Sequence, residues 1–531
     1  MHSYIYLFRG KSLSGMKQQP TTGWVKTVSV SAPSLQNNTA DAERVVAALK
    51  PALTAGTITI DLDLLRKLPG LIRNAGNDLN ITLSRRNDHW TVIGIAPVNA
   101  PAPIGAAIDL GTSRVVLRLV NLVTGDVLAE SAFDNPQGAI GPDILARIHH
   151  AAEPGGLGAL QALIVDGLNG ELSSLCRRCG FEPELVLRAA VAGNTAMTHL
   201  FMGLDPQWII REPYIPVVNR PELVKAADLG LKLNSRTRVY IFPNIGSYFG
   251  GDLIAGILYA GLHHREETAI MVDVVTNAEV VLGNRNWLIA CAGAAGPALE
   301  GGVTKIGMMA GPGVIDQVQR VPGTRKLRIR TIDDLPPIGI CGSGVIDLAA
   351  ALFMSGMLDI RGKLVPDRCD GRFRYQADLA HFVLVEGKDS GTGRDLTISQ
   401  ADIDSLIRSK AAMYTILETI SQSVGTALSD LASFYVAGTF GSFINPRAAI
   451  SIGMLPDLPS TAYHSLGNSS LGGATHYLSH ADRLAEIDSI RDSITYLELN
   501  VNQDFMNRFS AAKFLPHTNA GLFPSVIREA S

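Results

Sequence analysis

The sequence lacks a strong excess of charge of either sign. Only 18% of its 531 residues are charged, and the formal net charge is -3. The sequence therefore has neither the basic excess of a nucleic-acid surface nor the acidic run of a disordered arm. We expect no nucleic-acid partner.

Long hydrophobic runs are also absent, and cysteine is scarce. No segment reaches the ~18 uninterrupted apolar residues that a membrane-spanning helix needs. The first 15 residues contain Arg9 and Lys11 and lack the apolar core of a signal peptide. Five cysteines, an odd number in so long a chain, favour reduced thiols. We expect a cytoplasmic protein with no membrane partner, starting at Met1 or, if that start is over-extended, at Met16.

Hydrophobic residues make up 46% of the chain, which is enough for several buried cores, and 52 glycines suggest many tight turns. Helical periodicity near residues 39–76 precedes two alternating segments that predict a β-hairpin. A proline-rich stretch follows, and then the pattern changes to alternating strands and helices. The expected parts are a tail at 1–24, a small α+β module at 25–96, a linker at 97–103, and two larger α/β lobes at 104–264 and 265–531.

An acidic hairpin occurs twice in the two larger lobes. The first apolar strand ends at Asp109 and passes through the turn 111–113 into a second strand. The second copy ends at Asp273 and turns at Thr276 and Asn277. One such hairpin is equally well explained as an ordinary turn, but two matching hairpins indicate an internal duplication. We predict that Asp109 and Asp273 face one cleft.

These residue types suit a metal–phosphate site. Carboxylates at strand ends are ligands for hydrated Mg²⁺, and turn amides and hydroxyls bind phosphate oxygens. We expect Asp109 and Asp273 to hold the metal, directly or through water. The residues expected to bind phosphate are Gly111, Thr112, Ser113, Thr276 and Asn277.

An acid also follows Gly250-Gly251 and opens an apolar helix. Asp252 has two compatible interpretations, as the N-cap of that helix or as a carboxylate that orients or deprotonates an attacking water. Glycine-rich stretches elsewhere allow a nucleotide to approach the backbone, although helix–strand packing also selects glycine. The further candidates for nucleotide contact are Asn194, Gly342, Gly344, Gly438 and Gly441.

Together these motifs resemble the actin/Hsp70/sugar-kinase superfamily of ATPases. Within that superfamily, residues 30–525 resemble the ATP-dependent reductive activators of corrinoid proteins. The segments that carry this narrower resemblance include "GNTAMTHLFMGLDP" (193–206), "PNIGSYFGGD" (243–252), "GICGSGVID" (339–347) and "AGTFGSFINPRAAISIGMLPDLP" (437–459).

The resemblance implies an α/β fold, a two-lobed duplicated RNase H-like ATPase domain preceded by the small α+β module. It implies ATP and Mg²⁺ as ligands, with Asp252, Asp109 and Asp273 as catalytic residues. The implied activity is the return of a corrinoid cobalt from Co(II) to Co(I) in a methyltransferase system. The implied partners are the corrinoid protein and an external electron donor such as a ferredoxin, and a homodimer is left open.

Two features depart from the family pattern. Many members carry an N-terminal [2Fe–2S] domain, whereas the first cysteine here is Cys176, and its neighbour Cys179 lacks partners with cluster spacing. We therefore interpret this pair as structural and expect no [2Fe–2S] cluster. In addition, Val275 stands where the family usually has glycine, and a β-branched residue resists a positive φ. That substitution predicts a reshaped second phosphate loop.

Two other functions remain open from the sequence. One is a nucleotide-gated protein that grips the corrinoid protein like a chaperone without electron transfer. The other is a small-molecule kinase of the same superfamily, which the position of Asp252 before the second hairpin would also suit.

Overall fold

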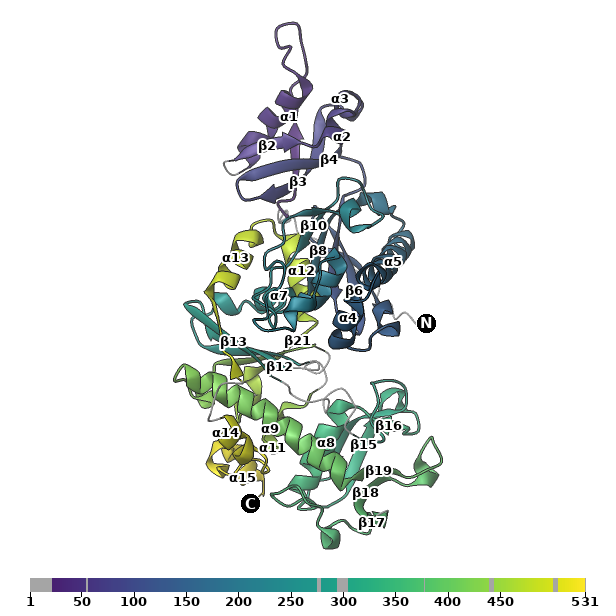
Figure 1. Ribbon diagram of the computed structural model, residues 1–531, viewed down its shortest axis with the longest axis vertical. Coiled ribbons are helices and arrows are strands. Elements are labelled where there is room, and N and C mark those ends of the chain that lie inside the picture. Colours follow the sequence, from purple (N-terminus) through teal and green to yellow (C-terminus); the bar gives the residue numbers. More distant parts are fainter. Residues whose placement is uncertain are drawn as a thin grey trace. The chain divides into compact units, whose positions relative to one another are not determined.

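The computed structural model describes residues 22–53, 56–274, 278–293, 304–376, 378–438, 444–499 and 505–530. The chain forms two compact units (Figure 1). Unit 1 comprises Met1–Tyr259 with Ser469–Asp492, and unit 2 comprises Ala260–Asn468 with Ser493–Ser531. Among the helices described, none has the length and apolar character needed to cross a membrane.

The N-terminal part of unit 1 is a small α+β module. Its four strands lie in the order β1-β3-β4-β2, and β3 and β4 form the hairpin that alternation predicts. Helices α1 and α3 bury Leu49, Leu68 and Ile72 in a core with residues of the sheet. The elements are β1 (Val25–Ser29), α1 (Asp41–Leu49), β2 (Thr57–Ile60), α2 (Leu62–Leu65), α3 (Leu68–Ala75), β3 (Asp78–Arg86) and β4 (His89–Pro97).

The sequence suggested a tail at residues 1–24. The residues just before β1 are packed instead. Thr22 and Trp24 are buried, and the indole Nε1 of Trp24 donates to the carbonyl oxygen of Tyr477 at 3.1 Å. A large aromatic ring held by a distant helix explains this departure, because its burial outweighs the tendency of a terminal segment to stay solvated. The remainder of the predicted tail, residues 1–21, lies outside the described residues.

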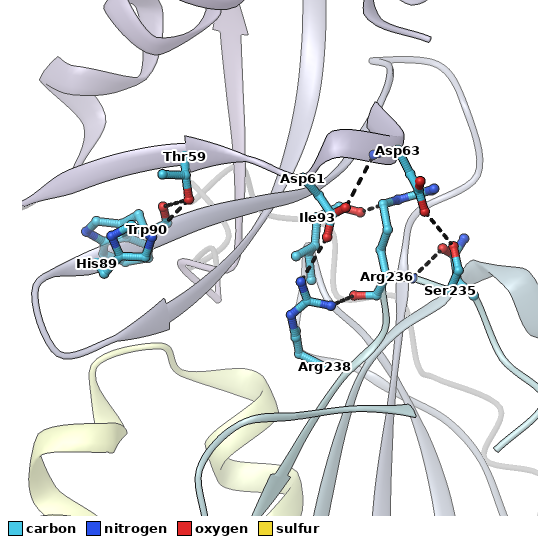
Figure 2. Close-up of polar contacts among 10 residues, drawn as sticks. Thr59, Asp61, Asp63, His89, Trp90, Ile93, Ser235, Arg236 and Arg238 are labelled. Carbon is cyan, nitrogen blue, oxygen red and sulfur yellow. Dashed lines mark hydrogen bonds and ion pairs between the residues drawn. The ribbon is translucent and has the colours of Figure 1, made fainter. Parts of the chain in front are cut away.

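Polar contacts join the module to the sheet that follows it, and Figure 2 shows one set. The Arg238 guanidinium donates to Asp61 Oδ2 at 2.9 Å, and Arg236 Nε donates to the carbonyl oxygen of Ile93 at 2.9 Å. Asp61 also caps α2 by accepting from the Asp63 amide. The side chains of Asp61 and Arg238 are each 13% exposed, so this ion pair is largely sheltered from solvent.

The rest of unit 1 is built on a six-stranded sheet in the order β7-β6-β5-β8-β10-β9. Strands β5, β6 and β7 form an antiparallel meander, and β8 and then β10 add in parallel. The strands are β5 (Ile104–Leu110), β6 (Arg114–Asn121), β7 (Val127–Asp134), β8 (Val186–Gly193), β9 (Val224–Lys225) and β10 (Arg238–Ile241). The helices are α4 (Ile144–Ala151), α5 (Gly156–Arg178), α6 (Thr195–Met202), α7 (Gly251–Ala260), α12 (Ser469–Ser479) and α13 (Arg483–Ser493).

Two of these helices come from late in the chain. Figure 1 shows α12 and α13, in yellow, beside the blue and teal elements of unit 1. The sequence assigned residues 469–492 to the second lobe, yet they pack here because Leu471, Ala474 and Tyr477 of α12 are fully buried and the helix contacts β5, β6 and β8.

Unit 2 contains a second six-stranded sheet, in the order β21-β20-β11-β12-β13-β22. Strands β11, β12 and β13 form an antiparallel meander, and β20 and then β21 add to β11 in parallel. The strands are β11 (Ala269–Val274), β12 (Ala278–Asn284), β13 (Trp287–Gly293), β20 (Ser433–Ala437), β21 (Tyr463–Gly467) and β22 (Ile494–Tyr496).

Smaller sheets and long helices complete unit 2. The 24-residue helix α9 begins with a capping box in which Ser399 and Asp402 exchange hydrogen bonds, and it is buried along much of its length. The additional strands are β14 (Val314–Arg320), β15 (Leu327–Thr331), β16 (Gly339–Ile340), β17 (Phe373–Gln376), β18 (Leu379–Val385) and β19 (Leu396–Ser399). The helices are α8 (Gly342–Met354), α9 (Gln400–Ser423), α11 (Pro446–Ser451), α14 (Phe505–Ala512) and α15 (Pro524–Ala530).

The order of five strands in the first sheet thus repeats in the second, and the sixth strand is added at a different edge, β9 beside β10 and β22 beside β13. In both sheets a meander is followed by two strands parallel to the first strand of the meander. Asp109 is the penultimate residue of β5, and Asp273 is the penultimate residue of β11. The internal duplication predicted from the two acidic hairpins is therefore present in the topology.

Candidate functional site

The candidate site of unit 1 begins at the carboxyl end of β5. Asp109 pairs with Val116 of β6 and with Ala192 of β8, and its side chain is half-buried. The hydroxyl of Ser470, at the start of α12, donates to Asp109 Oδ1 at 2.8 Å. The parallel strands β5 and β8 end at the same edge of the sheet. The Asp109 carboxylate therefore lies at the carboxyl ends of the strands, where ligands of α/β proteins commonly bind.

The turn after β5 is shaped by its glycine. A side chain on Gly111 would lie 2.3 Å from the carbonyl oxygen of Arg114, so only glycine fits the close return of the chain. Asn135 supports the turn, because its Nδ2 donates to the Gly111 carbonyl oxygen at 2.9 Å and its amide donates to the Ser113 carbonyl oxygen at 2.8 Å. Ser113 itself is exposed.

Asn194 connects that turn to the neighbouring strand β8. It is the N-cap of α6, and its Oδ1 accepts from the Met197 amide at 2.9 Å. Its Nδ2 donates to Thr112 Oγ at 3.1 Å. The parallel register, in which Leu110 lies opposite Gly193, brings the two residues together. The structure thus places Asn194 and Thr112 side by side.

Two glycines bring Asp252 to the same place. A methyl group on Gly250 would lie 2.5 Å from the Asn194 Cα and 2.3 Å from Asp252 Oδ1. One on Gly251 would lie 2.6 Å from the carbonyl oxygen of Phe242, which follows β10. The backbone before α7 therefore packs against the end of β8, and the carboxylate of Asp252 lies beside Asn194.

The helix start differs from the N-cap interpretation of Asp252. Helix α7 begins at Gly251, so Asp252 is its second residue, and its Oδ1 accepts from the adjacent Leu253 amide at 2.9 Å. A carboxylate in the first turn is stabilised by the helix dipole without serving as the cap. The Asp252 side chain is half-buried, and the alternative interpretation, in which it orients a water, stays a prediction.

In unit 2, Asp273 has a glycine as its neighbour. Ala437, the last residue of β20, lies opposite Asp273, and Gly438 follows with φ +78°. A methyl group on Gly438 would lie 3.1 Å from Asp273 Oδ1. Gly438 thus provides both the left-handed backbone and the close approach to Asp273. The predicted site residues Thr276, Asn277 and Gly441 lie outside the described residues, as does Val275.

One glycine near the start of α8, Gly344, has a packing role in the structure. A methyl group on Gly344 would lie 2.5 Å from the carbonyl oxygen of Ile315 in β14, and Gly342 is the buried first residue of the helix. The close contact of α8 with β14 accounts for Gly344, which is the alternative that the sequence left open.

The same helix carries a buried acid that sequence analysis did not single out. Asp347 is 3% exposed, and its Oδ2 accepts from the Val318 amide at 3.2 Å. Burial raises the pKa of Asp347 to about 6, although hydrogen bonds from Val318 and Asn445 act in the opposite direction. The available sequence signal was an acid within the otherwise apolar segment 342–354.

All five cysteines lie in the described part of the chain and are free thiols. Cys176 is packed in the core of unit 1, and burial raises the pKa of its thiol to about 11. Burial also raises the pKa of Cys179 and of Cys291. A small buried side chain of this kind serves packing in an apolar core. The structural interpretation of the Cys176–Cys179 pair stays a prediction.

Comparisons with known families cover nearly the whole chain. Three family models match in succession, described as the RACo linker region (residues 17–101), the RACo middle region (104–265) and the C-terminal domain of RACo, the ASKHA domain (267–527). The last description agrees with the ATPase fold that the duplicated hairpins predict.

Individual relatives point the same way. The chain is 30% identical over 413 residues to the corrinoid activation enzyme RamQ of Eubacterium limosum, covering 76% of this chain and 69% of that protein. It is 23% identical over 440 residues to a Co(II) methylated amine-specific corrinoid protein reductase of Methanosarcina barkeri, covering 76% and 75%. A solved structure of a reductive activator for corrinoid, iron-sulfur protein matches with a TM-score of 0.83 and 37% identity, covering 97% of this chain and 82% of that one.

Proposed function

Because the chain belongs to the RACo family of corrinoid activators, we propose that it uses ATP to return the cobalt of a corrinoid protein from Co(II) to Co(I). Cobalt gains one electron from a separate donor, and ATP and water give ADP and phosphate. The reduction is uphill for ordinary donors, so hydrolysis must be coupled to it. Such coupling requires two protein states that bind nucleotide and partner with different affinities.

The observation that carries the nucleotide part of this proposal is the convergence of polar residues at one edge of the unit 1 sheet. Asp109 is the penultimate residue of β5, Asn194 caps the helix after β8, and Asp252 lies in the first turn of α7. The hydrogen bond between Asn194 and Thr112 joins the two strand ends. Carboxylate, amide and hydroxyl groups brought together by backbone packing are the groups that a nucleotide phosphate and its metal need.

The donor set fits Mg²⁺. Asp109 offers carboxylate oxygens at a strand end. Mg²⁺ prefers such oxygen ligands and keeps several of its waters. When bound, Mg²⁺ would offset the negative charge of the phosphates. In this proposal Asp109 supports the metal, as Asp273 does from unit 2.

The remaining candidate residues serve either nucleotide binding or ATP hydrolysis in this proposal. Gly111, Thr112 and Ser113 bind phosphate oxygens through amides and hydroxyls, and Asn194 orients Thr112. Asp252 orients the attacking water and accepts its proton. From unit 2, we propose that Thr276, Asn277 and the glycines Gly342, Gly438 and Gly441 contribute to nucleotide binding, whereas Gly344 serves the packing of α8 on β14.

Electrons come from outside this chain in the proposal. Cys176 is packed in the apolar core of unit 1, and the sequence offers no set of cysteines with cluster spacing around it. Anaerobically purified protein should therefore contain no stoichiometric iron or acid-labile sulfide. Stoichiometric iron with a visible spectrum that disappears in Cys176→Ser would contradict this part.

The decisive experiment combines the protein with a candidate corrinoid protein held in the Co(II) state. Titanium(III) citrate serves as the reductant, and the Co(I) absorption band is followed with ATP, with ADP and without nucleotide. We expect Co(I) to appear only with ATP and at a rate that depends on the concentration of the protein.

The same assay separates the two other functions. Tight, nucleotide-dependent binding of the corrinoid protein without Co(I) formation would favour the chaperone-like function. Phosphoryl transfer from ATP to a small acceptor, with no effect of the corrinoid protein on turnover, would favour a kinase.

A further inference from the structure

Helix α12 reaches the candidate site from a distant part of the chain. Ser470 donates from its hydroxyl to Asp109 Oδ1 at 2.8 Å across a sequence separation of 361 residues. Ser470 is 6% exposed, so the hydrogen bond is shielded from competing water.

The position of α12 is fixed by close packing on α7, the helix that carries Asp252. A methyl group on Gly473 would lie 2.1 Å from the carbonyl oxygen of Ala255, and one on Gly472 would lie 2.7 Å from the ring of Tyr259. Only glycine permits backbones to approach this closely. The start of α12 is therefore held against the helix that carries one candidate carboxylate while its serine contacts the other.

Two further contacts hold the helix against the sheet. Arg118 of β6 donates to Thr475 Oγ at 3.1 Å, and the fully buried Arg188 of β8 donates to the Tyr477 hydroxyl at 2.6 Å. These contacts hold helix α12 against the sheet of unit 1. The Ser470 hydroxyl therefore lies on a rigid element.

The preceding serine provides an internal comparison. Ser469 is 1% exposed, and its hydroxyl has no hydrogen-bond partner among the described residues. The two neighbouring buried serines at this helix start therefore differ in hydrogen bonding, because only Ser470 contacts Asp109.

We propose that Ser470 is a positioning residue that sets the orientation of the Asp109 carboxylate for Mg²⁺-nucleotide binding. The terminal torsion of an aspartate is broad and nearly two-fold, so the side chain alone does not fix the directions of its oxygens. A hydroxyl held by α12 removes that freedom. The inference rests on the proposed function, because it assumes that Asp109 supports the metal.

The test compares Ser470→Ala with the matched variants Ser469→Ala and Ser470→Thr. Binding of a fluorescent ATP analogue is titrated with Mg²⁺ and, separately, in EDTA, and ATP turnover is measured alongside. Mutation of a residue that hydrogen-bonds to a metal ligand typically lowers metal affinity by about 10–100-fold. We expect a Mg²⁺-dependent loss of that size in Ser470→Ala, unchanged binding in EDTA, and near wild-type behaviour in the other two variants.

Two controls separate this inference from the proposed function. Asp109→Asn should lose the same Mg²⁺-dependent component, and Ser470→Ala should add no further loss in that background. Wild-type behaviour of Ser470→Ala beside a defective Asp109→Asn would overturn the positioning role alone. Equal losses in Ser469→Ala and Ser470→Ala, present also in EDTA, would overturn it in favour of a general effect on the helix start. Wild-type behaviour of Asp109→Asn would instead remove the premise.

Discussion

The guanidinium carbon of Arg188 lies 3.5 Å from the centre of the Trp24 ring. Arg188 is fully buried, and besides this contact it donates to the carbonyl oxygen of Leu83 at 3.0 Å and to the Tyr477 hydroxyl at 2.6 Å. One side chain on β8 therefore contacts the N-terminal segment, the α+β module and α12. Such a buried cation is tolerated because aromatic rings and oxygen acceptors surround it.

Replacing this cation should weaken unit 1 strongly. Arg188→Met keeps most of the volume but leaves the Leu83 carbonyl and the Tyr477 hydroxyl without their donor. We expect the free energy of unfolding to fall by about 2–4 kcal/mol. Chemical denaturation followed by tryptophan fluorescence measures this. The control Arg86→Met removes a cation that is 57% exposed in its pair with Glu222, and it should change stability by less than about 1 kcal/mol. Equal effects of the two variants would contradict the role assigned to Arg188.

The ion pair between Asp61 and Arg238 should couple the module to the sheet of unit 1. In a double-mutant cycle with Asp61→Asn and Arg238→Gln, we expect a coupling energy of about 1–2 kcal/mol, because both side chains are only 13% exposed. Asn at position 61 retains an acceptor for the α2 cap, so the cycle reports mainly on the pair.

A second ion pair between the module and the rest of unit 1 supplies the control for that cycle. Arg86 and Glu222 are 57% and 64% exposed, and their coupling energy should stay below about 1 kcal/mol. A coupling energy near zero for Asp61 and Arg238 would show that shape complementarity alone holds the module.

Asp252→Asn should separate chemistry from binding. If Asp252 orients the attacking water, turnover should fall by about 10²–10⁴-fold while affinity for Mg²⁺-ATP changes little. Steady-state hydrolysis and direct nucleotide titration give the two values. Asp143→Asn serves as the matched control, because Asp143 is the exposed N-cap of α4 and asparagine caps equally well. Unchanged hydrolysis in Asp252→Asn, with an active wild type, would remove Asp252 from the mechanism.

The pKa of Asp347 predicts a pH dependence of stability. Its pKa is raised to about 6 in the folded state, whereas an unfolded aspartate titrates near about 3.9. Below about pH 4 Asp347 is protonated in both the folded and the unfolded state, and its ionisation does not lower the free energy of unfolding. As pH rises from about 4 to 6, the unfolded state ionises first, so the contribution of this group to stability falls, by about 3 kcal/mol in all.

Asp347→Asn cannot ionise and retains an acceptor for the Val318 amide. The stability of the wild type relative to this variant should therefore decline between about pH 4 and pH 6 and become constant above that range. Denaturation curves collected across this range test the prediction. Parallel curves for the two proteins would show that Asp347 ionises normally in the folded state.

The local features of the fold were predictable from the sequence. Strict alternation and turn residues predicted the β3–β4 hairpin and both acidic meanders, because period-two patterning and turn chemistry act over a few residues. The same local signals singled out Asp109 and Asp252. The chance that glycines in "GICGSGVID" serve packing was also visible, and the close contact of Gly344 with Ile315 bears it out.

What the tertiary structure alone decided are the contacts between distant segments. No periodicity in residues 469–492 indicates that they pack in unit 1, that Ser470 contacts Asp109, or that Trp24 lies under Arg188. Sequence patterns report which face of an element is apolar, but not which other apolar face covers it. That choice depends on the packing of the whole unit, in which each pairing is favourable only once the others have formed.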